Sequence, residues 1–370
     1  MSREGRGLSF RFAVSSFLTP DFKIKASWQH GVRRGGRPIK RRKPQTENRK
    51  PPSFPFPPTP LTLRLDNAAG WGMFLKHVPN PGAMQKDSMN VMVTGAAGRL
   101  GSAVTKELAA AGHTVSAVDI CMPQKREHLK RTVVADLVSR EVAYPLMDGI
   151  EVLIHLANHP GEVRRDAQTM VHDNVSMNMN VFQAALECGV QRLYFASSIQ
   201  AFGLSPRHHP EDYQDSPRLL PLRLEDIKPR PRNSYALSKL MSEHMLEYFV
   251  REGAQTGVAL RFPHLLYLEE KPGYQALMDG KTRMKERASN EGETYLTMED
   301  AARLFAAFLD RDPAGFHVIF PASKKTISGE APGEVAARCF PGWGRRRDGG
   351  LESIVDLAMI KKLVDWEPKD

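Results

Sequence analysis

The chain has 370 residues, 41% of them hydrophobic and 25% charged, and no apolar run approaches the ~18 residues of a membrane-spanning helix, so the composition indicates a globular protein without a membrane span. Its three cysteines, Cys121, Cys188 and Cys339, are widely spaced, which excludes a disulfide-stapled scaffold and a zinc module, predicts no metal site and favours a reducing, cytoplasmic location. The formal net charge of +10 divides into +12 on residues 1–88 and −2 on residues 89–370, so the basicity gives no reason to expect a nucleic-acid-binding body.

Residues 1–88 form a basic leader that also holds 11 of the 27 prolines. Such a segment keeps neither a helical nor a strand period, and we expect it to be disordered. Three interpretations stay open. The first is an upstream start codon, with Met84 or Met89 as the natural first residue. The second is a targeting peptide, since the segment is rich in Arg and poor in acidic residues, and the third is a basic tail that contacts nucleic acid through residues 40–43.

The sequence becomes regular at Met89. Residues 89–94 predict a short apolar strand, and residues 95–101 a turn punctuated by glycine. A helix is expected over 102–111 and a second strand over 114–119. This order of strand, turn, helix and strand is typical of a βαβ unit.

Strands and helices continue to alternate through the rest of the chain. Strands are expected at 131–137, 151–157, 191–197, 258–262 and 315–320, and helices at 166–188, 235–251 and 298–310. This alternation predicts an α/β fold of the Rossmann type, a doubly wound parallel sheet with helices on both faces. We expect one domain over 89–370, in which residues 263–370 mainly supply a small substrate-binding portion.

The first turn of this domain carries three spaced glycines. Gly95 permits a tight exit from the strand, Gly98 lets backbone N–H groups approach a pyrophosphate, and Gly101 lets the helix pack close to the sheet. The helix N-terminus adds a favourable field for negative charge. Because the glycines follow a strand and open a helix, they predict a dinucleotide-binding site.

Two aspartates follow the second and third strands. Asp119 can accept hydrogen bonds from the adenosine ribose hydroxyls and would repel a 2′-phosphate, so the sequence favours NAD over NADP. Asp136 has two open interpretations, a contact with the adenine amino group and an N-cap for the segment after it.

A candidate catalytic set lies farther along the chain. Tyr235 and Lys239 share a helix face at the spacing i, i+4. An ammonium beside a phenol lowers the pKa of that phenol from its usual value of ~10, so that Tyr235 can take a proton from a substrate hydroxyl. Ser198, at the end of the preceding strand, can hydrogen-bond the reacting oxygen.

Taken together, these features resemble the extended short-chain dehydrogenase/reductase superfamily, also called the NAD-dependent epimerase/dehydratase family. The resemblance covers residues 89–370, and the ordered set of motifs is far more specific than any one of them. It rests on Thr94–Gly101, Asp136-Leu137, His155–Ala157, Asn174-Val175, Gly189-Val190, Ser197-Ser198, Phe202-Gly203, Tyr235–Lys239, Leu260–Phe262 and Asp365–Pro368.

The resemblance implies roles for individual residues. It places the dinucleotide on the glycine turn and on Arg99, Leu100, Asp119, Asp136, Leu137, Ala157 and Asn158. It places Pro263 near the nicotinamide and Asn174 toward the cofactor, although a buried structural role for Asn174 stays open. It makes Ser198, Tyr235 and Lys239 the catalytic set, and it implies a homodimer that pairs the helices at 166–188 and 235–251.

One departure from the family bears on the substrate. The family's Tyr-Gly-Pro turn is replaced here by residues 265–270, and the segment from Tyr267 to Tyr295 is shorter than in nucleotide-sugar epimerases. This favours a smaller polyhydroxylated substrate. The resemblance thus implies NAD-dependent oxidation of a secondary alcohol in a sugar or sugar acid, as in uronate and aldose dehydrogenases. The alternatives are a nucleotide-sugar epimerase such as UDP-glucose 4-epimerase, and a non-enzymatic NAD-sensing or RNA-binding protein.

Overall fold

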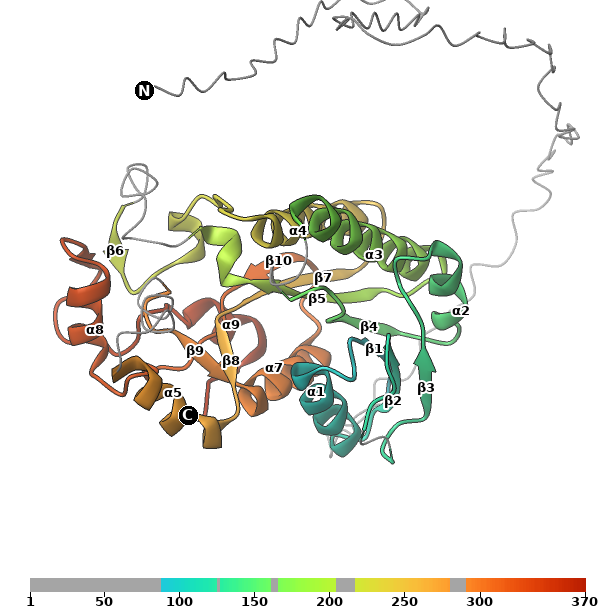
Figure 1. Ribbon diagram of the computed structural model, residues 1–370, viewed down its shortest axis with the longest axis horizontal. Helices are drawn as coiled ribbons and strands as arrows, with labels where there is room; N and C mark the ends of the chain where they lie inside the picture. Colours follow the sequence, from blue (N-terminus) through green and yellow to red (C-terminus); the bar gives the residue numbers. More distant parts are fainter. Residues whose placement is uncertain (1–87, 125–126, 161–165, 204–216, 280–290) are drawn as a thin grey trace, which may run out of the picture. The chain divides into compact units, whose positions relative to one another are not determined.

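The computed structural model describes residues 88–124, 127–160, 166–203, 217–279 and 291–370 (Figure 1). The leader predicted over residues 1–88 lies outside the described residues except for Ser88, and its interpretations stay predictions. Among the described residues, no helix is both long and apolar enough to cross a lipid bilayer.

Seven parallel strands form the central sheet. Several of them are buried on both faces, and their unbroken apolar runs explain why they form strands without alternation. The order is β10-β7-β5-β4-β1-β2-β3, so the direction of winding reverses between β1 and β4, which confirms the predicted doubly wound fold. The strands span β1 (Asn90–Thr94), β2 (Thr114–Asp119), β3 (Arg131–Val134), β4 (Val152–His155), β5 (Arg192–Ser198), β7 (Thr256–Phe262) and β10 (Gly315–Ile319).

Helices cover both faces of this sheet. The pair α3 (Ala167–Glu187) and α4 (Ser234–Arg251) lies on one face, and the pair α1 (Arg99–Ala110) and α7 (Met298–Arg311) packs on the other (Figure 1). Side-chain caps fix where three of them begin. Asp166, Asn233 and Thr297 accept the N–H of the residue three positions later, at 3.0, 2.7 and 3.1 Å respectively.

Two predicted boundaries were wrong by three residues, and the others differ from the structure by at most two. Helix α1 begins at Arg99 rather than at residue 102, because Gly98 is extended and acts as the N-cap, so Gly101 belongs to the helix and not to the turn. Strand β3 ends at Val134, where its pairing with β2 stops, and Asp136 therefore lies in the loop beyond the strand.

Besides the predicted elements, which include α7 and β10, the described residues form short elements that the sequence did not predict, most of them after β7. Strands β8 and β9 pair with each other, and β6 pairs with β11 across the chain. The bounds are α2 (Ala143–Leu146), β6 (Leu219–Leu220), β8 (His264–Leu266), α5 (Lys271–Asp279), β9 (Tyr295–Thr297), α8 (Pro332–Cys339), β11 (Gly344–Arg345) and α9 (Ala358–Val364). Short 3-10 turns occur at η1 (Arg140–Val142), η2 (Ile199–Phe202), η4 (Leu224–Asp226) and η5 (Leu268–Glu270).

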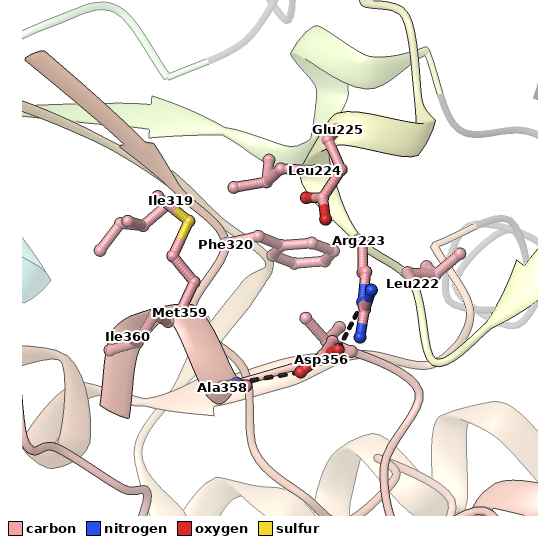
Figure 2. Close-up of a pocket in the computed structure, with 11 residues that line it drawn as sticks. Leu222, Arg223, Leu224, Glu225, Ile319, Phe320, Asp356, Ala358, Met359 and Ile360 are labelled. Carbon is pink, nitrogen blue, oxygen red and sulfur yellow. Dashed lines mark hydrogen bonds and ion pairs between the residues drawn. The ribbon is translucent and has the colours of Figure 1, made fainter. Parts of the chain in front are cut away.

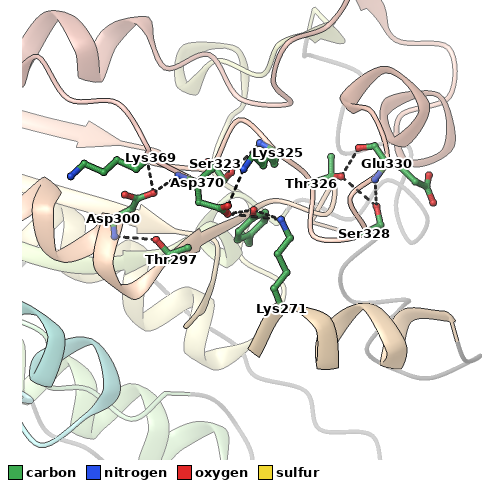
Figure 3. Close-up of polar contacts among 11 residues, drawn as sticks. Lys271, Thr297, Asp300, Ser323, Lys325, Thr326, Ser328, Glu330, Lys369 and Asp370 are labelled. Carbon is green, nitrogen blue, oxygen red and sulfur yellow. Dashed lines mark hydrogen bonds and ion pairs between the residues drawn. The ribbon is translucent and has the colours of Figure 1, made fainter. Parts of the chain in front are cut away.

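Polar contacts around Asp370 connect the last residues of the chain to β9, α7 and the residues after β10 (Figure 3). The Asp370 carboxylate accepts hydrogen bonds from Tyr295 Oη and, at 3.1 Å, from Lys325 Nζ. Its backbone N–H donates to Asp300 Oδ2 at 3.3 Å, and Asp300 is the third residue of α7. The residues after α9 are thereby tied to the helix that covers the sheet.

Candidate active site

A cavity of about 450 Å³ lies at the carboxyl edge of the sheet, beside the ends of β1, β2, β3 and β4. Open α/β sheets bind ligands at this edge, where the strand order reverses, and the volume lies in the range of small-molecule and cofactor sites. Ten of the twelve residues predicted to bind the dinucleotide line the cavity: Gly95, Gly98, Arg99, Leu100, Gly101, Asp119, Asp136, Leu137, Ala157 and Asn158.

The glycines of the first turn keep this cavity open. Gly95 has a φ of +69°, and a Cβ atom there would lie 2.7 Å from the backbone nitrogen of Ala157. A Cβ atom on Gly101 would lie 2.1 Å from the Gly95 carbonyl oxygen, so glycine is required where α1 approaches β1. The turn is therefore a cradle at a helix N-terminus, and its residues fit the pyrophosphate of a dinucleotide.

The two aspartates at the cavity have different surroundings. Asp119 accepts the N–H of Ala97 at 2.9 Å, which joins the glycine turn to the end of β2. Asp136 accepts the N–H of Val138 at 3.0 Å in a local turn. The next helical turn, η1, is preceded by Ser139, so the N-cap interpretation of Asp136 was wrong.

The Arg99 side chain extends from the glycine turn to the short elements after β7. Its guanidinium forms an ion pair with Glu270 and lies 5.2 Å from the centre of the Tyr267 ring. The wall of the cavity is thus connected to the segment that departs from the family pattern.

Helix α4 is anchored so that its first two turns face the same edge of the sheet. Within the helix, Glu243 accepts Arg261 Nε at 2.9 Å and Arg261 Nη2 at 2.7 Å, and Ser197 Oγ donates to the same carboxylate. All three side chains are buried. This ion pair ties α4 to β7 and β5 one turn after Lys239.

Lys239 is the most unusual side chain of the site. It is buried, and its Nζ donates to Asn158 Oδ1 at 2.8 Å and to the Ala196 carbonyl oxygen at 2.6 Å. Burial lowers the pKa of Lys239 to about 7, although Glu243 acts in the opposite direction. The Nζ also lies 5.6 Å from the centre of the Tyr235 ring.

Ser198 and Tyr235 lie at the ends of neighbouring elements. Ser198 is the last residue of β5, and its Oγ accepts the N–H of Gln200 at 3.2 Å. Tyr235 is in the first turn of α4 and is partly exposed. Asn233, which caps α4, donates to Gln200 Oε1 at 3.1 Å and so connects the two elements.

Two of the residues predicted to bind the dinucleotide do not line the cavity, and neither do the predicted catalytic residues Ser198, Tyr235 and Lys239. Asn174 is buried, accepts the His159 N–H at 2.8 Å and donates to Ser238 Oγ at 3.0 Å, which holds the loop after β4 against α4. Pro263 is buried between β7 and β8. Six lining residues were not predicted. Ile120, Ala135 and Leu156 directly follow a strand end, which was the available signal, and the others are His159, Pro160 and Met177.

A smaller cavity of about 140 Å³ lies beyond the end of β10, between η4 and α9 (Figure 2). Arg223 Nε donates to Asp356 Oδ2 at 2.7 Å on one side of it, and Asp356 also accepts the N–H of Ala358 at 3.0 Å. Ile319 and Phe320 supply apolar wall on the other side. Because its volume is below the range of cofactor sites and no glycine turn among the described residues lines it, this cavity is not a candidate for the dinucleotide.

Known proteins share both the sequence pattern and the fold. The family model "NAD dependent epimerase/dehydratase family" matches residues 91–276, half of the chain. A uronate dehydrogenase of Pseudomonas syringae pv. tomato is 27% identical over 64% of this chain and 76% of its own length. An NAD-dependent glucose-6-phosphate dehydrogenase of Haloferax volcanii is 30% identical over 43% of this chain and 62% of its own length.

Solved structures show the same architecture. A UDP-glucose 4-epimerase of Thermotoga maritima, solved with UDP-glucose, has a TM-score of 0.56 and 21% identity over 76% of this chain and 94% of its own. A short-chain dehydrogenase/reductase superfamily protein of Agrobacterium tumefaciens, solved with bound NAD, has a TM-score of 0.57 and 20% identity over 76% of this chain and 93% of its own. At these identities the likeness establishes the fold.

Proposed function

The chain belongs to the NAD-dependent epimerase/dehydratase family, and we propose that it oxidises a secondary alcohol of a sugar or sugar acid with NAD. The observation that carries this proposal is the burial of Lys239. Its ammonium lies beside the Tyr235 ring and is bonded to Asn158 in the wall of the glycine-lined cavity. A buried cation next to a phenol, bonded to a residue in the wall of this cavity, supports proton removal from an alcohol.

The three catalytic side chains divide the work. Lys239 stabilises the phenolate form of Tyr235, whose oxygen takes the proton of the substrate hydroxyl. The Ser198 Oγ already accepts from Gln200, so its own proton is available to hold the substrate oxygen. Bound NAD supplies the acceptor for the hydride that leaves the same carbon, and the product is a ketone or a lactone.

The glycine turn and Asp119 support the proposed cofactor. Gly95, Gly98 and Gly101 leave room that supports binding of a pyrophosphate, and Asp119 at the end of β2 lines the same cavity, which supports a contact with the ribose hydroxyls. The same carboxylate would repel a 2′-phosphate, which supports NAD over NADP.

The dehydrogenase outcome is favoured over epimerisation. The uronate dehydrogenase of P. syringae is a relative along three quarters of its length. The short path from Tyr267 to Tyr295 also supports a substrate without a nucleotide, with residues 263–370 supplying most of its pocket. A sugar acid or an aldose is therefore the proposed substrate class.

We also propose that the protein is a cytoplasmic homodimer. Leu237, Met241 and Tyr248 project from one side of α4 with 42%, 39% and 44% of their surface exposed, and Met179 of α3 is 42% exposed. Their spacing of four and seven residues forms an apolar stripe along α4. A second copy of the same two helices would cover that stripe.

The function is tested by following absorbance at the NADH band. The full-length protein is mixed with NAD and with separate uronates, aldoses and UDP-sugars. We expect NADH formation with a sugar acid or an aldose, lost in Tyr235→Phe and kept in the matched variant Tyr248→Phe, which changes an exposed tyrosine of the same helix. Equal rates in both variants would contradict the assigned role of Tyr235.

A further inference from the structure

A chain of buried polar side chains runs from the middle of the sheet to Lys239. Thr94 Oγ1 lies 2.6 Å from His155 Nδ1, and His155 Nε2 lies 2.7 Å from Asn178 Oδ1. Asn158 Nδ2 donates to the same Asn178 oxygen at 2.8 Å, and Asn158 Oδ1 accepts Lys239 Nζ. Thr94, His155 and Asn178 are completely buried, although none of them contributes chemistry to the proposed reaction.

The direction in which these hydrogen bonds donate is determined at the Thr94 end of the series. Thr94 Oγ1 accepts the backbone N–H groups of Leu156 and Ala157, both at 3.2 Å, so its own hydroxyl proton is the one that points to His155 Nδ1. A neutral imidazole that accepts at Nδ1 carries its proton on Nε2 and donates there. Burial lowers the pKa of His155 to about 3, which keeps the ring neutral.

The His155 proton then fixes the orientation of two amides. Because Nε2–H is a donor, Asn178 must turn its oxygen toward the imidazole, while its nitrogen donates to Ser242 Oγ. Asn158 must in turn present its nitrogen to Asn178 and its oxygen to Lys239. If either amide were rotated by half a turn, two donors would face each other in a buried site, which is costly.

We propose that Asn178 is a positioning residue for Lys239, acting through Asn158 and kept in orientation by His155 and Thr94. This inference rests on the proposed function, because it gives these hydrogen-bonded side chains the role of holding the catalytic ammonium. The neutral oxygens of Asn158 and Ala196 fix the ammonium.

The charges that face Lys239 support this interpretation. Among the described residues, Glu243 on α4 is the acidic group whose charge acts on it, and that carboxylate is already engaged by Arg261 of β7 and Ser197 of β5. The ammonium also lies near the rings of Tyr235 and, from β5, Phe195, whose centre lies 4.7 Å away, and its charge acts on the neutral His155 of β4. A fixed neutral acceptor therefore decides where the ammonium points.

The test begins with the wild-type protein, without any substitution. Nitrogen-15 NMR of the histidine rings should find His155 as the Nε2–H tautomer, unprotonated at Nδ1 at neutral pH. The Nδ1–H tautomer would overturn the proposal, because it would turn the Asn158 nitrogen toward Lys239.

Two variants then distinguish a role of Asn178 in positioning Lys239 from a role in packing alone. Asn178→Leu keeps the shape and removes the oxygen, whereas Ser242→Ala removes a hydrogen bond of the same asparagine and leaves the chain to Lys239 intact. Asn178→Leu releases Asn158, which lines the cofactor cavity, so by calorimetry we expect the Kd for NAD to rise about tenfold or more in this variant and to stay within about threefold in Ser242→Ala.

The outcomes distinguish this inference from the proposed function. A folded Asn178→Leu protein that binds NAD as the wild type does would overturn the positioning role and leave the function standing. If Asn178→Leu does not fold, the wild-type tautomer still decides the polarity of the chain. If the wild-type protein binds no NAD, the proposed function fails.

Discussion

Lys239 combines a catalytic assignment with an unfavourable environment for its charge. Burying an ammonium costs free energy that its hydrogen bonds with Asn158 and Ala196 only partly restore. A residue that persists under such a cost serves a purpose other than stability, and in this site the purpose is the ionisation of Tyr235.

The replacement Lys239→Met keeps an unbranched side chain that is one atom shorter and removes the charge. We expect turnover to fall about a hundredfold or more, since Tyr235 loses its cation. We also expect the Tm to stay the same or rise, since the buried charge is gone. NADH formation and thermal unfolding measure the two effects, with Lys106→Met on the exposed side of α1 as control. Undiminished turnover in Lys239→Met would contradict the assignment.

His155 makes the free energy of unfolding depend on pH in the acid range. Its pKa is lowered by burial to about 3, whereas a histidine in an unfolded chain titrates near ~6.5. Between these values the unfolded chain binds a proton that the folded chain does not, so stability is present above pH ~6.5 and is lost as the pH falls, by about 1.4 kcal/mol per unit.

Urea unfolding at several pH values between about 6.5 and about 4.5 measures this contribution. The wild type should lose stability more steeply with falling pH than His155→Asn, which has no titrating ring. The control His317→Asn changes a partly exposed histidine of β10 and should keep the wild-type slope. If the free energy of unfolding falls equally with pH in the wild type and in His155→Asn, the His155 ring is not held neutral.

At the scale of elements, the close approach of α1 to β1 is the feature most sensitive to a single methyl group. Gly101→Ala would place its Cβ against the Gly95 carbonyl, and we expect a loss of about 1–3 kcal/mol together with weaker NAD binding. Gly333→Ala in α8 meets no atom within 4 Å and should stabilise the protein by about 0.5–1 kcal/mol. Unfolding curves and NAD titrations of both variants check this, and an unimpaired Gly101→Ala protein would refute the cradle geometry.

Elements with a local signal could be predicted from the sequence. The strand at 114–119 was predicted with its observed bounds, and α4 within one residue, because apolar runs and caps such as Asn233 lie in the local sequence. The short pairs β6 with β11 and β8 with β9 could not be predicted, because two or three residues become a strand only through a distant partner.

The same distinction holds for the site. The glycine turn, the last residue of β2 and the residues after β4 were predicted because each lies in a short local motif, and they line one cavity. The hydrogen-bonded set through Asn178 was not predicted, because its members come from four separate parts of the sequence and meet only in the folded protein. The contact of Arg99 with Glu270 was missed for the same reason.

At the scale of the whole molecule, the apolar stripe on α4 predicts the oligomeric state. Light scattering coupled to size-exclusion chromatography should give twice the chain mass for the wild type, and the single-chain mass for Met241→Lys. Met359→Lys changes an equally exposed methionine on α9 and should leave the dimer intact. A wild-type protein that is monomeric at micromolar concentration would remove the proposed interface.

The central claim is that the hydride taken from the sugar is released as NADH and is not returned to the sugar. The most direct measurement follows a sugar acid or an aldose that carries deuterium on the carbon to be oxidised, mixed with the full-length protein and NAD. We predict that the deuterium appears in released NADH, one atom for each molecule of ketone or lactone formed. Deuterium that stays in an isomerised sugar, with no NADH released, would contradict the dehydrogenase account and identify the protein as an epimerase.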